Sequence, residues 1–379
     1  MQLKVLHVSP SIARADGGPS ELIRGLMPSL REMDVDVSLL STDKGMQRHD
    51  HDLSRESWVI VEPARGHPSF TFSPSLPKRL REMVPGSDVV HVHGLQSFPG
   101  SAAMRICRHY GVPYVLQPHG ALDAYSWRRH RFRKSAYALA DRKNWRSVGG
   151  VIYASAKEAA DGASVFSGRV AATIPPGVED NLLHVERASS VLGERTAVLF
   201  LGRLSKVKRL DLVLAAMAVE PLSQTTIELI VAGSPDGSMS PDPVEFARRS
   251  GIADRVKFLG TVDKETRRQL FTRVSALVLP SDDESFGMAA AEAMAAGVPT
   301  IVSPHVGIAS LPGAASALRL VPQDPVAISQ AIVDVIHDAE LAQSGREYAQ
   351  QHFSWRAAAA STLSFYQRVV DLHQTGKRQ

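Results

Sequence analysis

The chain has 379 residues, of which 44% are hydrophobic and 22% charged, a balance typical of a soluble globular protein and not of a disordered or fibrous one. Its formal net charge is +4, its aromatic content is 6%, and it carries no helix-turn-helix, zinc or RNA-binding signature, so we expect no nucleic-acid partner. Cys107 is the only cysteine, which excludes an internal disulfide and a cysteine-based zinc site.

The start of the chain enters an apolar strand pattern without a signal peptide, and no apolar run approaches the roughly 20 residues of a membrane span. We therefore expect a cytoplasmic location. At roughly 150 residues per domain, the length predicts two or three domains. Residues 1–180 hold 23 Lys and Arg against 18 Asp and Glu, so an anionic partner is expected on the first half of the chain.

In the first half, short apolar runs alternate with helical patterns that are bounded by Gly or Pro. Strands that alternate with helices form βαβ units and a parallel sheet, whose ligands gather at the carboxyl ends of the strands. A binding site is therefore expected in the loops that follow the strands. The expected strands are 4–10, 35–40, 58–61, 89–92, 114–116, 151–153 and 171–174.

Two adjacent glycines, Gly17 and Gly18, lie between the first strand and a helical pattern with leucines at 22, 26 and 30. Glycines there allow the backbone to approach a ligand closely, and they lead to a helix N-terminus, which favours anions. A plain turn is an equally good interpretation of these two residues alone. The loop is not GxGxxG, so the dinucleotide-binding fingerprint is absent.

Histidines lie at the ends of two of these strands. His91 and His93 alternate on one strand face, a pattern that can hold a metal, but no third ligand is evident nearby and we expect a structural or acceptor-side role. His119 leaves the next strand between Pro118 and Gly120, where it is well placed to hydrogen bond to a ligand. Capping of a turn is the alternative for His119.

Residues 125–146 are strongly basic, with Asp141 as the one acidic residue. Apolar and aromatic residues recur between the cations, which predicts an amphipathic helix that could lie on anionic lipid at the inner face of the cytoplasmic membrane. A solvated helix face is the alternative, and the sequence does not decide between the two. The cations are Arg128, Arg129, Arg131, Arg133, Lys134, Arg142, Lys143 and Arg146.

Residues 174–177 are dense in Pro and Gly and precede a second series of strands and helices, which divides the chain into domains 1–177 and 178–352. Its first strand is followed by a loop with four cations in seven positions, including Arg203 and Lys208. Exposed basic loops are common, but this one follows the carboxyl end of a strand, where ligands bind. The expected strands are 197–201, 227–232, 256–259, 276–279, 300–302 and 318–321.

After the strand 276–279, the polar residues 281–285 predict a turn, and the Ala- and Met-rich residues 286–296 predict a helix that Gly297 and Pro299 end. A helix N-terminus in such a turn attracts phosphates. Glu284 and Glu292 lie on either side of it, so the two carboxylates could reach opposite ends of a nucleotide sugar. Without their context, a helix-start carboxylate and a solvated helix residue would explain them equally well.

Residues 284–299, which read ESFGMAAAEAMAAGVP, closely resemble the signature of the retaining glycosyltransferases of family four. The Gly17-Gly18 loop and the GRLxxxK pattern that starts at Gly202 resemble other parts of that family, and the resemblance covers nearly the whole chain. It implies an α/β protein with the GT-B fold, two facing Rossmann-like domains with parallel sheets. The last helix, 353–373, would cross back to the first domain.

The resemblance also implies a role for each candidate residue. Glu284 would approach the donor sugar near its 3-hydroxyl, Glu292 would hold the nucleotide ribose, and His119 would lie beside the 6-hydroxyl of the donor sugar. The catalytic set would be His119, Arg203, Lys208 and Glu284. The donor-binding set would be Gly17, Gly18, Ser285, Phe286, Gly287 and Glu292.

The implied reaction is transfer of a hexose from a UDP- or GDP-linked sugar to a hydroxyl, with retention, on a saccharide or lipid-linked intermediate of cell-surface polysaccharide. Asp34-Val35-Asp36 has the form of a metal-binding motif, but it follows a helix directly and we expect a turn there, so the reaction is expected to need no metal or other cofactor. A nucleotide-sugar epimerase of the same fold and a non-catalytic sugar-nucleotide-binding subunit are the alternatives.

Overall fold

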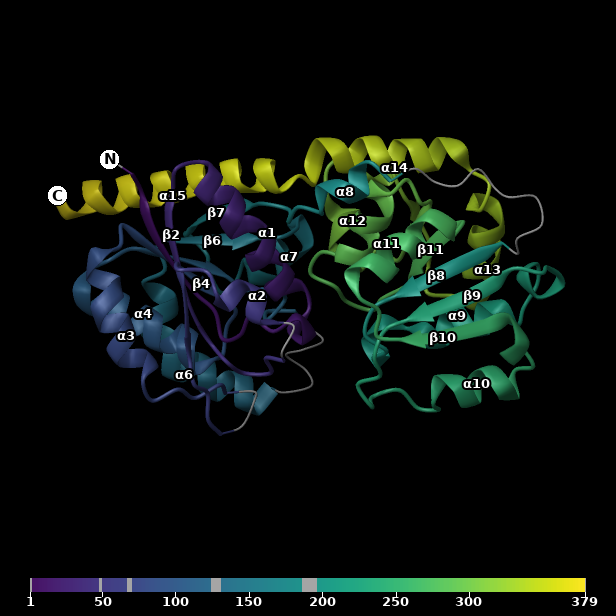
Figure 1. The fold of residues 1–379 in the computed structure, drawn as a ribbon, viewed down its shortest axis with the longest axis horizontal. Coiled ribbons are helices and arrows are strands. Elements are labelled where there is room, and N and C mark those ends of the chain that lie inside the picture. The colour runs from purple at the N-terminus through teal and green to yellow at the C-terminus, as the bar shows by residue number, and fades with distance from the viewer. Residues whose placement is uncertain (1, 48–49, 67–69, 124–130, 186–195, 379) are drawn as a thin grey trace. The chain divides into compact units, whose positions relative to one another are not determined.

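The computed structural model describes residues 2–47, 50–66, 70–123, 131–185 and 196–378 (Figure 1). The chain forms two compact units. The first contains Met1–Gly177 together with Trp355–Gln379, and the second contains Val178–Ser354. No helix in the described ranges combines the length and the apolar character needed to cross a bilayer.

The first unit is built on a seven-stranded, fully parallel sheet in the order β3-β2-β1-β4-β5-β6-β7. The order reverses between β1 and β4, which is the point at which open α/β sheets bind their ligands. Every strand predicted in this half is confirmed within a few residues. The strands are β1 (Lys4–Val8), β2 (Asp36–Thr42), β3 (Val59–Glu62), β4 (Val89–His93), β5 (Tyr114–Gln117), β6 (Gly150–Tyr153) and β7 (Val170–Thr173).

Helices cover both faces of this sheet, and each face has its own apolar core. Leucines of α1 pack on one face with Phe365 and Tyr366 of α15, whereas α3 and α4 pack on the other face. The helices of the unit are α1 (Gly18–Glu32), α2 (His51–Ser54), α3 (Leu76–Met83), α4 (Phe98–Tyr110), α6 (Arg131–Arg146), α7 (Ala156–Gly162) and α15 (Trp355–Arg378).

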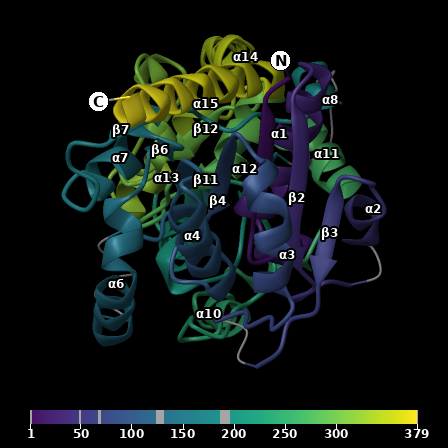
Figure 2. The same ribbon diagram turned by 90° about the vertical axis from the view of Figure 1, so that its left-hand side faces the viewer.

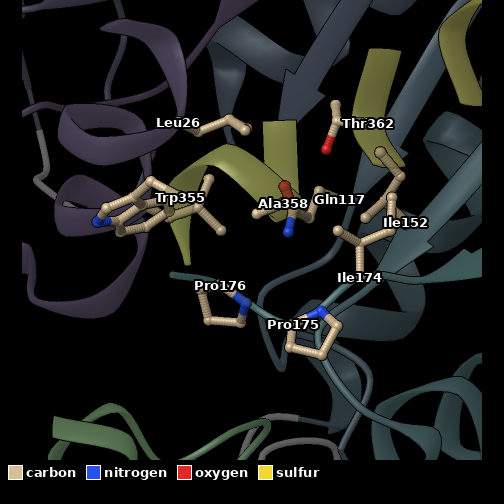
Figure 3. Close-up of a pocket in the computed structure, with 10 residues that line it drawn as sticks. Leu26, Gln117, Ile152, Ile174, Pro175, Pro176, Trp355, Ala358 and Thr362 are labelled. Atoms are coloured by element: carbon tan, nitrogen blue, oxygen red, sulfur yellow. The ribbon is translucent and has the colours of Figure 1, made fainter. Parts of the chain in front are cut away.

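The last helix, α15, belongs to the first unit, as the GT-B fold requires, and it packs beside α1 (Figures 1 and 2). The two helices approach closely because α1 has Gly25 at the contact: a Cβ there would lie 2.0 Å from the ring of Trp355. A small pocket remains under the start of α15, and Figure 3 shows Leu26, Gln117 and Pro176 around it with Trp355.

The second unit repeats the architecture with a six-stranded parallel sheet in the order β10-β9-β8-β11-β12-β13. Here the order reverses between β8 and β11. The strands are β8 (Ala197–Leu201), β9 (Glu228–Ala232), β10 (Val256–Gly260), β11 (Ala276–Leu279), β12 (Thr300–Val302) and β13 (Arg319–Leu320). The helices are α8 (Asp180–Leu183), α9 (Leu210–Met217), α10 (Pro243–Arg249), α11 (Lys264–Arg273), α12 (Met288–Ala295), α13 (Pro325–Val335) and α14 (Ala339–His352).

One boundary next to the candidate site differs from the prediction. The helix expected over 286–296 begins at Met288, because Glu284 and Phe286 pair their backbone with the segment after β12 instead of entering the helix. The amide of Ile308 donates to the carbonyl oxygen of Phe286 at 2.6 Å. This pairing is long-range, so a local helix propensity does not reveal it.

Candidate functional site

The second unit brings Lys208 and Glu284 into direct contact. The ammonium nitrogen of Lys208 lies 2.6 Å from Oε1 of Glu284, and 18% of each side chain is exposed. Lys208 follows β8 and Glu284 follows β11, so the pair lies where the strand order of the sheet reverses. Two of the predicted catalytic residues therefore meet at the edge of the sheet where a ligand is expected.

A network of polar contacts holds the Lys208 loop against the loop that follows β11. Arg209 has a φ of 54° and directs its guanidinium to Asp282 at 3.0 Å. The amide of Asp282 donates to the carbonyl oxygen of Val207 at 2.7 Å, and Gln323 donates to the carboxylate of Asp282 at 2.7 Å. Asp282 thus serves to fix the two loops. Arg203, in contrast, is exposed at the start of its loop.

The segment after β12 fixes the backbone of Glu284. The amide of Glu284 donates to the carbonyl oxygen of His305 at 3.2 Å, and the amide of Gly307 donates to the carbonyl oxygen of Glu284 at 2.9 Å. The hydroxyl of Ser281 lies 3.4 Å from the second carboxylate oxygen of Glu284. The loop after β11 and the segment after β12 therefore fix the orientation of the Glu284 carboxylate.

Ser285, Phe286 and Gly287 lead from Glu284 into α12. Gly287 caps the helix with a φ of 108°, and a Cβ there would lie 2.6 Å from Val306, so no other residue fits. The ring of Phe286 is 3% exposed and packs edge-on against Phe353. Any contact of Phe286 with a ligand must therefore come from its backbone.

Glu292 is buried, which rules out the alternative of a solvated helix residue. Its side chain is 7% exposed, and Oε1 lies 3.1 Å from the guanidinium of Arg267 on α11. Sequence reasoning missed Arg267, because nothing in the pattern of α11 distinguishes it from the neighbouring Arg268, which pairs with Glu265 at the surface. A buried carboxylate with a cation beside it can accept hydrogen bonds from a ligand.

In the first unit, Gly17 and Gly18 form the start of α1, directly after the β1 loop. Gly17 has φ 74° and ψ −133°, a conformation that only glycine adopts readily. A Cβ on either glycine would meet no atom within 4 Å, so the space beside this helix N-terminus is open. The arrangement suits the backbone contact that the sequence predicted.

His119 lies at the exit of β5 with a φ of 53°. Glu158 of α7 holds the turn: its carboxylate accepts hydrogen bonds from the amides of Gly120, at 2.5 Å, and Ala154, at 2.7 Å. Burial raises the pKa of Glu158 and lowers the pKa of His119 to about 4. His119 is therefore a neutral imidazole at pH 7. Glu158 was not predicted, because its link to the turn becomes visible only in the fold.

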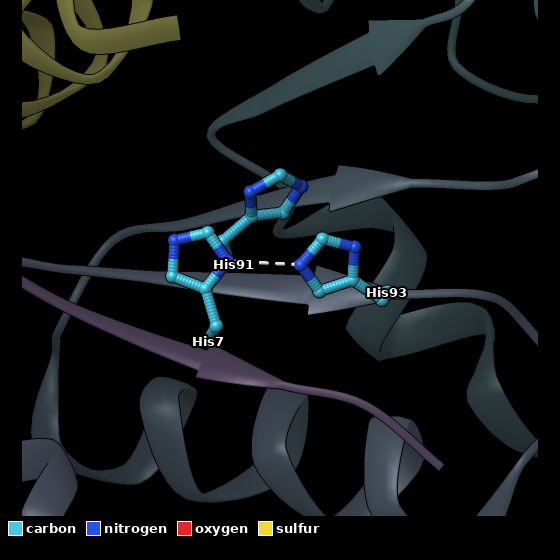
Figure 4. A group of neighbouring side chains, drawn as sticks. All are labelled: His7, His91 and His93. Atoms are coloured by element: carbon cyan, nitrogen blue, oxygen red, sulfur yellow. Dashed lines mark hydrogen bonds between the residues drawn. The ribbon is translucent and has the colours of Figure 1, made fainter. Parts of the chain in front are cut away.

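The expectation that no third possible ligand lies near His91 and His93 is wrong. His7 of β1 lies beside them, and the ligand nitrogens of the three residues lie within 4.8 Å of one another (Figure 4). However, Nδ1 of His7 and Nε2 of His93 are 2.9 Å apart, a hydrogen-bond distance. Two nitrogens at 2.0–2.1 Å from one tetrahedral zinc ion would be about 3.4 Å apart, so the three rings fit hydrogen bonding better than a shared metal.

The Asp34-Val35-Asp36 motif, which has the form of a metal-binding motif, forms other contacts. Asp34 has a φ of 59° in the turn between α1 and β2, and its carboxylate accepts from Gln2 at 2.9 Å. The turn expected at Asp34-Val35-Asp36 is confirmed. Among the described residues, the three buried histidines are the only group of His, Cys, Asp and Glu with metal-ligand spacing.

The basic segment 125–146 is described in part. Residues 125–130 lie outside the described residues, and α6 begins at Arg131. Asp141 and Trp145 are buried against α4, where the carboxylate of Asp141 is hydrogen bonded to Ser101. Arg142 and Lys143 are exposed, as is Leu139. A helix forms over Arg131–Arg146 as predicted, but its polar and apolar residues are not cleanly separated, because Leu139 is exposed and Asp141 is buried, and contact with lipid stays a prediction.

Two family models match the chain. Residues 17–177 match the glycosyl transferase 4-like domain, and residues 185–352 match the glycosyl transferases group 1 model. The boundary between the two matches lies within a few residues of the boundary between the two compact units in the sequence, and together the matches cover most of the chain. The chain belongs to the group 1 glycosyltransferases.

Curated relatives match part of this sequence. A D-inositol 3-phosphate glycosyltransferase of Streptomyces coelicolor is 33% identical over 211 residues, which are 52% of this chain and 46% of the relative. A protein of the same name from Catenulispora acidiphila is 32% identical over 54% of this chain and 52% of its own length. The matches thus span about half the length of these relatives.

Solved structures resemble nearly the whole chain at lower identity. A sucrose-phosphate synthase from Thermosynechococcus elongatus has a TM-score of 0.74 and 20% identity, with 98% of this chain and 100% of that chain covered. HepE of Anabaena, solved in complex with UDP and glucose, has a TM-score of 0.76 and 19% identity, covering 96% and 100%. These likenesses confirm the fold, two Rossmann-like domains of the GT-B type.

Proposed function

We propose that the protein is a retaining glycosyltransferase that moves a hexose from a UDP- or GDP-linked sugar to a hydroxyl group. The observation that carries this proposal is the contact of Lys208 with Glu284, 2.6 Å apart at the carboxyl ends of β8 and β11. A cation for phosphate and a carboxylate for sugar hydroxyls therefore lie side by side, next to the Gly287 cap of α12. A cation and a helix N-terminus can bind the diphosphate of a nucleotide sugar, and a carboxylate can accept hydrogen bonds from its sugar.

In this proposal, each residue meets one part of the donor. Lys208 and Arg203 bind the diphosphate, together with the backbone from Ser285 to Gly287 at the start of α12. Glu284 accepts hydrogen bonds from the transferred sugar. Glu292, held by Arg267, accepts hydrogen bonds from the ribose.

The first unit would supply the remaining contacts. His119 meets a hydroxyl of the donor sugar, and the loop at Gly17 and Gly18 approaches the diphosphate and the acceptor. The relatives named D-inositol 3-phosphate glycosyltransferase suggest a phosphorylated polyol as one acceptor to test. A saccharide or lipid-linked intermediate of cell-surface polysaccharide is the acceptor class implied by the resemblance.

The chemistry follows from the charges. As the bond between the anomeric carbon and the diphosphate breaks, negative charge grows on the phosphate oxygens, and Lys208, Arg203 and the α12 N-terminus stabilise it. No carboxylate in the set has the role of a covalent nucleophile. We therefore propose attack of the acceptor hydroxyl on the same face that the leaving group departs from, which retains the anomeric configuration. The leaving diphosphate can take the proton of that hydroxyl.

The test uses the purified full chain. UDP-glucose and GDP-mannose are first compared by thermal shift, because a ligand at 100 times its dissociation constant stabilises a protein by about 2.7 kcal/mol. The stabilising donor is then incubated with inositol phosphate or with saccharide acceptors, and the anomeric proton of the product is followed by NMR. An α-linked product from an α-linked donor supports the proposal.

Three results would contradict all or part of the proposal. Release of a 2-epimer from the donor without acceptor would show a nucleotide-sugar epimerase. Donor binding without turnover in any acceptor mixture, including a lipid extract, would favour a non-catalytic sugar-nucleotide-binding subunit. An inverted product would leave glycosyl transfer in place but would overturn the retaining mechanism.

A further inference from the structure

A chain of hydrogen bonds runs through the first unit to His119. The hydroxyl of Tyr366 on α15 lies 3.3 Å from Nε2 of His7. Nδ1 of His7 lies 2.9 Å from Nε2 of His93, the link drawn in Figure 4. Nδ1 of His93 then lies 3.1 Å from Nε2 of His119. The chain therefore connects the returning helix to the residue proposed to contact the sugar.

The hydrogen bonds of such a chain must all run in the same direction. Burial lowers the pKa of His7 to about 3 and holds the pKa of His93 well below its usual value, so each ring is neutral and carries one N–H. If Tyr366 donates to His7, then His7 donates to His93 and His93 donates to His119. The N–H of His119 is then on Nδ1. In the opposite direction, Nδ1 of His119 carries a lone pair instead.

His91 determines which direction holds. Its Nδ1 lies 2.6 Å from the hydroxyl of Tyr366, and its Nε2 is buried without a hydrogen-bond partner among the described residues. A buried N–H without an acceptor costs its full desolvation and is rare in folded proteins, whereas an unpaired lone pair is better tolerated. The N–H of His91 is therefore assigned to Nδ1 and donates to Tyr366. The hydroxyl hydrogen of Tyr366 is left to donate to His7.

We infer that Tyr366, His7 and His93 are positioning residues that hold His119 as the tautomer protonated on Nδ1, so that it offers a hydrogen-bond donor to an oxygen atom of the substrate. This rests on the proposed function, which places His119 at the donor sugar. His119 is half-buried, and within the described part of the chain no hydrogen bond reaches its Nδ1. The imidazole would act as a neutral donor and not as a general base.

The direct test needs no activity. Histidine is labelled with ¹⁵N in the full chain, and two-bond ¹H–¹⁵N correlation spectra at pH 7.5 identify the protonated nitrogen of each ring. We expect His7, His91, His93 and His119 all to be protonated on Nδ1. Protonation of His119 on Nε2, a cationic ring, or the shifts of metal-bound nitrogens on His7 and His93 would each overturn the inference.

A matched pair of variants tests the transmission along the chain. His93→Phe removes the donor to His119. His91→Phe replaces a stacked ring on the same strand and removes the donor that orients the hydroxyl of Tyr366, so that both directions of the chain become possible. We expect the Nδ1 of His119 to lose its proton in a large share of molecules in both variants. Unchanged His119 spectra in both variants would show that the chain does not set its tautomer. Should either variant fail to fold, the spectrum of the unaltered protein still decides the assignment.

Kinetic measurements test the role of the Nδ1–H of His119 as a hydrogen-bond donor to the substrate. The amide nitrogen of Asn reaches nearly the position of Nδ1, and that of Gln nearly the position of Nε2, and Asn also tolerates the φ of 53°. We expect His119→Gln to lose roughly tenfold more of kcat/KM for the nucleotide sugar than His119→Asn loses, the usual scale of one hydrogen bond. The opposite order would overturn the role assigned to Nδ1. A protein that shows the predicted spectra but no transfer would contradict the proposed function and not the tautomer.

Discussion

The ammonium nitrogen of Lys208 lies 2.6 Å from a carboxylate oxygen of Glu284, and this ion pair occupies the place proposed for the donor diphosphate and sugar. A diphosphate that reaches Lys208 also comes near Glu284. Two unit negative charges 4 Å apart repel by about 4 kcal/mol at an effective dielectric constant of 20. Lys208 must therefore stay close to both the diphosphate and Glu284 during the reaction. Its charge then stabilises the transition state more than it strengthens binding of the donor.

This relationship predicts that substitutions in the donor site change different kinetic constants. Lys208→Ala removes a charge that meets the leaving group, so we expect kcat to fall by about 100- to 1000-fold while donor binding weakens moderately. Glu292→Gln should mainly raise the donor KM, because the ribose does not change during the reaction. Glu284→Gln should impair both constants. Steady-state kinetics at saturating donor provide the comparison, and near-normal kcat in Lys208→Ala would show that the lysine does not serve the leaving group.

The ion pair of Arg267 with Glu292 predicts a stability effect that a second substitution reverses. Arg267→Met leaves the buried carboxylate of Glu292 without this cation, so we expect the free energy of unfolding to fall by up to about 3 kcal/mol. Urea denaturation measures it. Arg267→Met combined with Glu292→Gln should recover most of the loss.

The control is Arg268→Met on the same helix. Arg268 pairs with Glu265 at the surface, so its replacement should change stability by less than about 1 kcal/mol. An equal loss in the two arginine variants would mean that the effect comes from α11 itself and not from the carboxylate of Glu292.

Donor turnover is expected to survive chelation of metal ions. Lys208, Arg203 and the N-terminus of α12 can neutralise the diphosphate, and Asp282 is engaged by Arg209 and Gln323. Initial rates in EDTA should therefore match those in added Mg²⁺ within about twofold. Complete loss in EDTA that Mg²⁺ or Mn²⁺ restores would identify a metal site that the present assignment lacks.

The sequence predicted the fold more fully than the site. The central strands, such as β4, β8 and β11, are buried on both sides, so their apolar runs are continuous and were located from composition alone. The signature residues Glu284 and Glu292 were recognisable because they lie in one short segment. In contrast, Glu158, Arg267 and His7 act through partners far away in the sequence, and no local pattern identifies them.

The start of α12 likewise could not be predicted from the local sequence. Phe286 has the helix-forming neighbours that predicted a helix, but its carbonyl accepts from Ile308, and the helix begins two residues later. The difference affects the site, because Gly287 and not Ser285 caps the helix that faces the proposed phosphates. Tertiary pairing decided the boundary, and only the fold reveals that pairing.

Contact of α6 with anionic lipid predicts a binding that salt weakens. Arg142 and Lys143 are exposed beside Leu139, which is 73% exposed, and each basic residue near such a surface contributes about 1 kcal/mol. We expect the double substitution Arg142→Gln with Lys143→Gln to lower the affinity for phosphatidylserine vesicles by at least tenfold. Co-sedimentation with the vesicles measures this affinity. The same change at the exposed Arg248 and Arg249 of α10 is the control. Equal effects of the two pairs, or no effect of salt, would leave α6 as a solvated helix.

The three buried histidines predict a steep loss of stability in mild acid. Burial lowers the pKa of His7 to about 3 and holds those of His91 and His93 well below the ordinary value, and the same rings in the unfolded chain titrate near 6.5. The unfolded state therefore binds more protons as the pH falls below about 6.5, while the folded state does not. The stabilisation is present above pH 6.5 and is lost progressively toward the folded pKa values.

The expected size follows from the same linkage. Each of the three histidines, and His119 with its pKa of about 4, should lower the free energy of unfolding by about 1 kcal/mol between pH 6.5 and 5.5, hence about 4 kcal/mol together, and urea denaturation at the two pH values measures this difference. His91→Phe should reduce the difference by about one quarter, because one of the four sites no longer titrates in the unfolded chain. A free energy of unfolding that stays constant from pH 6.5 to 5.5 would mean that the rings take up protons in the folded protein as they do in the unfolded chain, and the one-directional hydrogen-bond chain of neutral rings to His119 could not then persist at pH 5.5.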